Sequence, residues 1–378
     1  MDCRMLRELA RSPWLLAASM CAVLVILLTV ALTSASEVRA LPRADPQEAL
    51  YGVQLDWDHD TPAAYSQRLG ASPVVFGAFE DFPLVVDAEL ERIAGEVRAA
   101  RGTLMLTLEP HGGLGTVTDA ELARLTDWLT HWNDQGLPVI VRFAHEMNGT
   151  WYAWGQQPEA YVATFRRVAA AVREAPASEI LWSPNEGSYY PFPGGEPPRT
   201  SRDFELLDTD GDGELTQADD PYAPYFPGHE HVDWVGLSVY HFGHEWPWGA
   251  NEIPEANKFS EKVTGSYHGL GGDHTDVPDF HAVYGVSGGH PVVISETSAL
   301  FVAGEGGADH VDIKQAWFDQ VFAEDLLERL PAIELVVWFE HDKEEQDVPG
   351  AVTQWSSTQD PAVLLAKREA LPDWLHLR

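Results

Sequence analysis

The stretch VIVRFAHEMNGTWYAWG, residues 139–155, begins as a strand and ends in polar and aromatic residues. Its first five residues are apolar or β-branched apart from Arg142, which is typical of a buried strand rather than a helix. A zinc protease needs a second histidine four residues after His145 on the same helix face, and that position holds Gly149. The His145–Glu146 pair is therefore predicted to end a strand.

Seven further apolar runs share this character, and helical patterns lie between most of them. Proline stands in the first turn of the patterns at 61–70 and 157–175, and a Thr-x-x-Glu capping box begins the pattern at 118–136. Eight buried strands that alternate with helices predict an α/β fold, a (β/α)8 TIM barrel with its chemistry at the strand ends. The strand segments are 50–57, 72–81, 103–111, 138–146, 179–186, 232–240, 291–298 and 333–341.

Composition excludes several classes of protein. The chain has 378 residues, of which 45% are hydrophobic, and this is enough for a large core. Its formal net charge of −35 disfavours nucleic acids and anionic membrane surfaces as partners. A neutral polymer remains a suitable partner, and we expect a monomer.

The N-terminus has the pattern of a leader. Three arginines precede an apolar run at 14–33, and no charged residue lies between Arg11 and Glu37. Residues 1–36 are predicted to be a signal peptide or an N-terminal membrane anchor, followed by a linker at 37–48 and the barrel at 49–378. The protein is thus expected to be secreted or anchored outside the cell. Both cysteines, Cys3 and Cys21, lie in the leader, so we expect no disulfide in the barrel.

The predicted strand ends are rich in carboxylates and aromatic rings. Tryptophan stacks on the apolar face of a sugar, and carboxylates can act on it as acid, base or nucleophile. Any one of these groups could instead be an ordinary hydrogen-bonding residue of a barrel mouth. Their convergence from eight segments favours a sugar-binding mouth. The residues are Asp56, Trp57, Glu80, Asp81, Glu109, His111, His145, Glu146, Asn185, Glu186, Tyr240, His241, Glu296, Trp338, Glu340 and His341.

Three of these segments resemble glycoside hydrolase family 26, the β-mannanase family of retaining (β/α)8 barrels. The most specific of them is the run His-Glu-Met-Asn-Gly-x-Trp-x-x-Trp-Gly at 145–155, and the others are VDWVGLSVY and PVVISETS. The resemblance implies that Glu146 is the general acid/base and Glu296 the nucleophile. It also implies that Tyr240 holds the nucleophile. Together with the strand-end residues it gives the expected substrate contacts His111, His145, Trp151, Trp154, Tyr240 and Trp338.

The chemistry of a retaining hydrolase agrees with these roles. It needs two carboxyl groups about 5 to 5.5 Å apart, one ionised and one protonated, and strands four and seven of a barrel can supply them. The charge of Glu296 should keep Glu146 protonated until the first step. The pair Asn185–Glu186 is an internal rival for the acid/base position, but the tryptophan-rich run follows Glu146 instead.

The stretch DTDGDGELTQAD, between the fifth and sixth predicted strands, has the spacing of a calcium loop. Its predicted ligands are Asp208, Asp210, Asp212, the carbonyl of Glu214, and Asp219 at the position where a glutamate is usual. A solvated acidic turn is the alternative. We expect a structural calcium ion and no cofactor for catalysis.

The predicted function is a retaining endo-β-glycanase that acts by double displacement, with β-1,4-mannan as the favoured substrate. A β-glucanase or β-xylanase of the same family is an alternative, because Ser238 stands where the mannanases typically carry an aspartate in Gly-x-Asp-x-Tyr. A carboxylate hydrogen bond to a sugar is worth about 1.5 to 3 kcal/mol. The other alternative is an inactive polysaccharide-binding barrel, although such a module has no need of both Glu146 and Glu296.

Overall fold

The computed structural model describes residues 38–244, 246–269, 277–345 and 348–378. The predicted leader, residues 1–36, lies outside this part of the chain. Residues 38–48 of the predicted linker form no helix or strand. Within the described ranges, no helix is long and apolar enough to cross a membrane.

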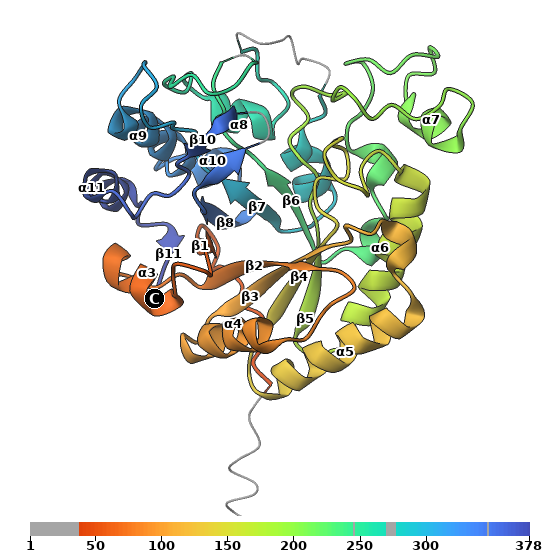
Figure 1. The fold of residues 1–378 in the computed structure, drawn as a ribbon, viewed down its shortest axis with the longest axis horizontal. Coiled ribbons are helices and arrows are strands. Elements are labelled where there is room, and N and C mark those ends of the chain that lie inside the picture. Colours follow the sequence, from red (N-terminus) through yellow and green to blue (C-terminus); the bar gives the residue numbers. More distant parts are fainter. Residues whose placement is uncertain (1–37, 245, 270–276, 346–347) are drawn as a thin grey trace, which may run out of the picture.

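Eight parallel strands form a closed barrel, as the sequence predicts (Figure 1). Each strand pairs with the next, and β1 also pairs in parallel with β8, which closes the sheet. The short strand β11 (Leu375–His376) pairs with the start of β1. The barrel strands are β1 (Ala49–Leu55), β2 (Val75–Asp81), β3 (Thr103–Glu109), β4 (Val139–Phe143), β5 (Ser178–Trp182), β6 (Trp234–Ser238), β7 (Val292–Thr297) and β8 (Ile333–Glu340).

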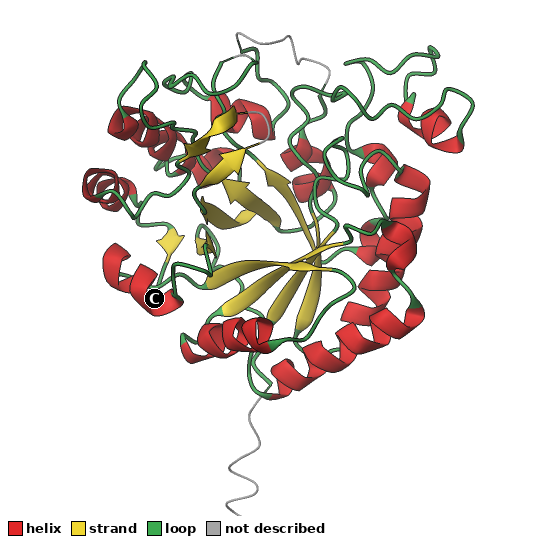
Figure 2. Cartoon of the chain, in the orientation of Figure 1, coloured by secondary structure: helices red, strands yellow, loops and turns green. Residues whose placement is uncertain are grey.

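Helices surround the barrel (Figure 2). The predicted N-cap of α5 is confirmed, because the Thr118 side chain accepts a hydrogen bond from the Glu121 amide. A hairpin of β9 (Lys343–Glu345) and β10 (Val348–Thr353) follows β8 and was not predicted. The α-helices are α3 (Pro62–Leu69), α4 (Ala88–Ala99), α5 (Asp119–Asp134), α6 (Pro158–Val172), α7 (Arg202–Leu207), α8 (Lys258–Val263), α9 (His310–Val321), α10 (Leu326–Arg329) and α11 (Pro361–Ala370). Short 3-10 turns η1 (Leu114–Thr116), η2 (Ala223–Tyr225) and η3 (His229–His231) and the π-helix η4 (His281–Ser287) complete the elements.

Side chains along each strand point alternately into the barrel and toward the helices. The inward set is a separate apolar cluster that fills the barrel, and the outward set belongs to the larger core beneath the helices. The barrel is therefore a packed core rather than a channel. The inward cluster includes Leu50, Val75, Met105, Ile140, Leu181, Trp234, Val293, Leu335 and Val337.

Candidate active site

Glu296 lies near the end of β7 and is held by two groups from other strands. Arg142 of β4 is completely buried and forms an ion pair with Glu296 Oε1, and the Tyr240 hydroxyl donates to Oε2 at 2.6 Å. A second Arg142 nitrogen donates to Ser238 Oγ at 2.8 Å. Both Glu296 oxygens therefore accept hydrogen bonds, which hold the carboxyl group in one orientation.

A β-bulge directs Glu296 toward Arg142. Leu237 pairs with Ile294 but the next residue, Ser238, pairs with Glu296, so β7 has one extra residue against β6. The same extra residue appears against β8 between Ile294 and Thr297. A bulge re-aims a side chain that simple alternation would send elsewhere, because two residues then face one on the neighbouring strand.

Glu146 comes three residues after the end of β4, on a backbone that leaves the strand direction. Ala144 and Glu146 have φ angles of 46° and 52°, in the left-handed region that non-glycine residues seldom adopt. The Glu146 amide donates to Ser183 O at 2.9 Å, which ties this turn to the end of β5. The Trp151 indole nitrogen donates to Glu146 Oε2 at 2.9 Å. Such local strain is common where a reactive side chain is positioned.

The electrostatics of Glu146 favour its protonated form. Burial and then the charge of Glu296 raise the pKa of Glu146 to about 7, while Arg142, Ser238 and Trp151 act in the opposite direction. Glu146 therefore remains protonated in weakly acidic solution. The neighbouring Glu296 is held by two hydrogen-bond donors, Arg142 and Tyr240. Two neighbouring carboxyl groups in such different environments can serve as acid and nucleophile.

Glu109, at the end of β3, belongs to the same electrostatic group. Burial and the charge of Glu296 raise the pKa of Glu109 to about 7. His111 places its Nε2 3.6 Å from Glu109 Oε2 and 3.6 Å from Asp81 Oδ1, and about half of its side chain is exposed. His111 thus lies at the mouth, where a ligand could contact it.

His145, the residue before Glu146 in the sequence, contacts Tyr152. His145 is buried, and burial followed by the charge of Arg142 lowers its pKa well below the ordinary value, so its ring is neutral. Its Nε2 lies 3.1 Å from the Tyr152 hydroxyl. Trp151, by contrast, is 41% exposed and presents an aromatic surface beside Glu146. These positions suit Trp151 for contact with a sugar and His145 for holding its neighbours.

The structure corrects two predicted substrate contacts. Trp154 is completely buried, donates to His145 O at 2.7 Å and stacks on Tyr152 at 4.3 Å. Trp338 is also completely buried, with Phe318 5.0 Å and the Lys367 ammonium 4.6 Å from its ring. Trp338 therefore faces α9 and α11 rather than the mouth. Its inward neighbours in the alternation of β8 are Val337 and Phe339, and Phe339 contacts the ring of Tyr240 at 5.9 Å.

Glu186, the rival for the acid/base position, is engaged elsewhere. It forms a buried ion pair with Lys262 and accepts hydrogen bonds from the amide and hydroxyl of Ser188. The Glu186 carboxylate is therefore occupied by its own buried partners, Lys262 and Ser188. The residue that the sequence prediction missed is Arg142, whose signal was a basic side chain at an inward position of an otherwise apolar strand.

The acidic loop between β5 and β6 brings three of its predicted ligands together. Ligand oxygens of Asp208, Asp210 and Asp212 lie within 4.8 Å of one another. Asp208 Oδ2 accepts from the Gly213 amide at 3.0 Å, whereas Asp208 Oδ1 is buried without a hydrogen-bond partner. The predicted ligand Asp219 does not join this group. It is buried, and its carboxylate closes the loop by accepting from the amides of Thr209 and Thr216 at 2.6 and 2.8 Å.

Comparison with known proteins agrees with this geometry. Residues 104–191, which contain Arg142, Glu146 and Trp151, match the sequence model of glycosyl hydrolase family 26. Endoglucanase H of Acetivibrio thermocellus is 22% identical over 277 residues, which are 71% of this chain and 24% of that protein. A mannan endo-1,4-beta-mannosidase of Bacillus subtilis is 26% identical over 143 residues, 35% of this chain and 32% of that protein. The match thus spans about a quarter to a third of the length of these relatives.

Solved structures show the same fold over most of the chain. A family 26 β-mannanase from Bacteroides ovatus superposes with a TM-score of 0.54 at 13% identity, covering 88% of this chain and 90% of that one. The endo-β-1,4-mannanase of Cellulomonas fimi gives 0.53 at 15% identity, with 88% and 72% covered. The predicted barrel and the resemblance to family 26 are confirmed.

Proposed function

We propose, from the premise that this chain is a glycoside hydrolase of the family 26 type, that it cleaves internal bonds of a β-glycan with retention of configuration. The observation that carries the proposal is the pairing of Glu146, whose pKa is raised to about 7, with Glu296, which is held by Arg142 and Tyr240. A retaining hydrolase needs one protonated and one ionised carboxyl group at the same bond.

In the first step, a Glu296 oxygen attacks the anomeric carbon while the proton of Glu146 passes to the departing glycosidic oxygen. The glycosidic bond breaks, and a covalent ester forms between the sugar and Glu296. Glu146 is then ionised and takes a proton from water. The hydroxide equivalent attacks the anomeric carbon, the ester bond breaks, and the Glu296 carboxylate is restored with Glu146 protonated again.

The favoured substrate is β-1,4-mannan, since several of the similar proteins are named as mannanases. Ser238 argues for a wider range, because it receives a hydrogen bond from Arg142 and cannot offer the carboxylate that mannanases typically place there. The similarity to an endoglucanase supports a β-glucan as the alternative. A non-catalytic binding barrel is disfavoured, because buried carboxyl groups with such different environments have a cost that binding alone does not require.

The test is hydrolysis of β-1,4-mannan, mixed-linkage β-glucan and β-1,3-xylan, with the anomer of the first product read by NMR. A β product before mutarotation is expected. Glu296→Ala should be inactive on all substrates, whereas Glu146→Ala should retain turnover of aryl glycosides with good leaving groups, which depart without protonation. Azide should rescue Glu146→Ala and give a β-glycosyl azide.

Glu186→Gln is the matched control, because it removes the rival carboxylate. Its turnover should need no azide, and its main effect should be lower stability from the unpaired Lys262. Wild-type turnover by Glu296→Ala, or an α first product, would contradict the proposed mechanism.

The acidic loop is part of the proposal as a structural calcium site. Three gathered carboxylates with one unpartnered buried oxygen fit a hard divalent cation, which takes oxygen ligands. Asp208, Asp210 and Asp212 would hold the ion, with the Glu214 carbonyl as a further ligand. Bound calcium would neutralise these charges and order the loop, and it would take no part in the hydrolysis. Export of the enzyme is likewise a proposal, which rests on the pattern of residues 1–36.

A further inference from the structure

An open surface depression of about 660 Å³ lies at the carboxyl end of β1, and neither Glu146 nor Glu296 lines it. It lies between the loop that follows β1 and the N-terminal turns of α3 and α4. We call it the β1 cavity, and its functional side chains are Trp57, Asp58, His59, Glu89 and Arg92. None of the roles derived above for the catalytic pair uses these residues.

The β1 cavity adjoins the mouth of the barrel. Asp56, the first residue after β1, has His59 Nδ1 3.0 Å and His341 Nε2 3.9 Å from its Oδ2. His341 follows β8, so this oxygen links the loop after β1 to the rim of the mouth. The Asp56 carboxylate therefore lies between His59, which lines the cavity, and His341, which follows β8.

Trp57 supplies a fixed aromatic surface in the cavity. Its indole nitrogen donates to Gly77 O at 2.8 Å, which anchors the ring to β2. Arg92 of α4 donates to Trp57 O at 3.1 Å, and its guanidinium lies 6.0 Å from the centre of the ring. A ring held in this way can stack on a sugar with little loss of side-chain entropy.

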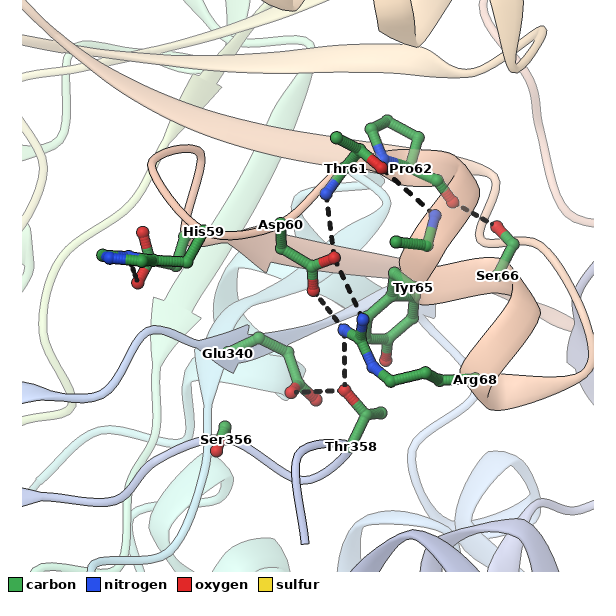
Figure 3. Close-up of polar contacts among 12 residues, drawn as sticks. His59, Asp60, Thr61, Pro62, Tyr65, Ser66, Arg68, Glu340, Ser356 and Thr358 are labelled. Carbon is green, nitrogen blue, oxygen red and sulfur yellow. Dashed lines mark hydrogen bonds and ion pairs between the residues drawn. The ribbon is translucent and has the colours of Figure 1, made fainter. Parts of the chain in front are cut away.

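The β1 cavity is lined by both hydrogen-bond donors and acceptors, with more carboxylates than cations. Arg92 and His59 supply donors, and Glu89, 3.6 Å from Arg92, supplies a carboxylate beside the exposed Asp58. Asp60 is excluded from ligand binding, because its carboxylate accepts from the Thr61 amide at 2.8 Å and pairs with Arg68 (Figure 3). The side chain of His59 points away from Asp60 in the same view. Mixed donors and acceptors around an indole favour a neutral, hydroxyl-rich ligand over an anion.

We propose that the β1 cavity is a distal subsite that binds a sugar unit of the polysaccharide outside the catalytic centre. The proposal rests on the proposed β-glycanase function. It adds a site at which a long polysaccharide gains affinity that a short oligosaccharide lacks. Trp57 stacks on the sugar, and Arg92, Asp58 and Glu89 bind its hydroxyl groups.

The test compares kcat/KM on a soluble β-glycan with kcat/KM on an aryl β-glycoside too short to reach the cavity. The ratio of the two values should fall about tenfold in Trp57→Ala and about threefold in Arg92→Ala. Arg98→Ala is the matched control, because Arg98 lies on the same helix but contacts the Trp132 ring outside the cavity. Its ratio should equal that of the wild type.

Affinity electrophoresis in the same β-glycan gives a second readout that needs no hydrolysis. Retardation should be weaker in Arg92→Ala and in Asp58→Ala than in Arg98→Ala, and these surface variants keep the test valid if Trp57→Ala fails to fold. Equal ratios and equal retardation in the cavity variants and the control would overturn the subsite while leaving the hydrolase assignment intact. If the wild type hydrolyses no β-glycan but is still retarded more than the cavity variants, the proposed function is contradicted and the subsite is not.

Discussion

Replacing Glu296 with glutamine should lower the pKa of Glu146 from about 7 toward the ordinary range of a carboxyl group. Burial raises this pKa most, and the charge of Glu296 is the next cause. Glutamine keeps the shape and the burial but removes the negative charge. Arg142 then remains as an unneutralised cation, which also favours the ionised form of Glu146.

The size of the shift follows from Coulomb's law. Two unit charges about 5.5 Å apart, the separation a retaining pair needs, interact by about 3 kcal/mol at an effective dielectric constant of about 20. One pKa unit corresponds to about 1.4 kcal/mol, so the pKa of Glu146 should fall by about two units, to about 5. The same loss of charge occurs when Glu296 becomes an ester, which would turn Glu146 from an acid into a base during turnover.

The assay is a carbon-13 NMR titration of glutamate carboxyl groups in the wild type and in Glu296→Gln, with the Glu146 signal assigned by Glu146→Gln. Glu80 is an internal control. Its pKa is also raised to about 7, but by burial and by Asp87, Glu89 and Asp81, so it should not move. An unchanged Glu146 pKa in Glu296→Gln, with Glu80 also unchanged, would refute the electrostatic pairing of the two carboxyl groups.

Three further outcomes are expected. In the wild type, kcat/KM on polysaccharide should fall above pH 7 as Glu146 loses its proton. In Trp151→Phe the basic limb of this pH profile should move upward by about half to one pH unit, because the variant lacks the indole hydrogen bond that favours ionised Glu146. A basic limb at the wild-type pH would contradict that contact. EDTA should lower the melting temperature of the wild type by several degrees, and added calcium should restore it. The melting temperature of Asp208→Ala should change with neither EDTA nor calcium. Equal wild-type melting curves in EDTA and in calcium would exclude the site. Ser238→Asp should raise the ratio of kcat/KM on mannan to kcat/KM on mixed-linkage glucan about tenfold. If the wild type is instead a strong mannanase and the substitution reduces that activity, Ser238 does not limit recognition of mannan.

The sequence by itself determined the barrel and the place of its chemistry. Apolar runs such as 139–143 are buried on both faces, and helices between them allow only parallel connections. Since all parallel strands then end on the same side, the ends of β4 and β7 had to share one mouth. Glu146 and Glu296 could be selected from that rule together with the family resemblance.

Only the tertiary structure decided which way the side chains near those ends face. β8 is apolar on nearly every residue, so its sequence has no alternation from which to place Trp338 toward the helices and Phe339 toward the mouth. The bulge in β7, which aims Glu296 at Arg142, depends on pairing with β6 and β8 at once.

Pairing of buried charges is also a property of the closed barrel. Arg142 and Glu296 are 154 residues apart, and Glu186 and Lys262 are 76 apart, so local sequence carries no signal of either pair. An unpaired charge is too costly to bury, so each buried charge needs a partner of opposite sign. Closure of the barrel decides which residue is close enough to be that partner. That choice raises the pKa of Glu146 to about 7 and pairs Glu186 with Lys262, although both carboxyl groups stand at the ends of predicted strands.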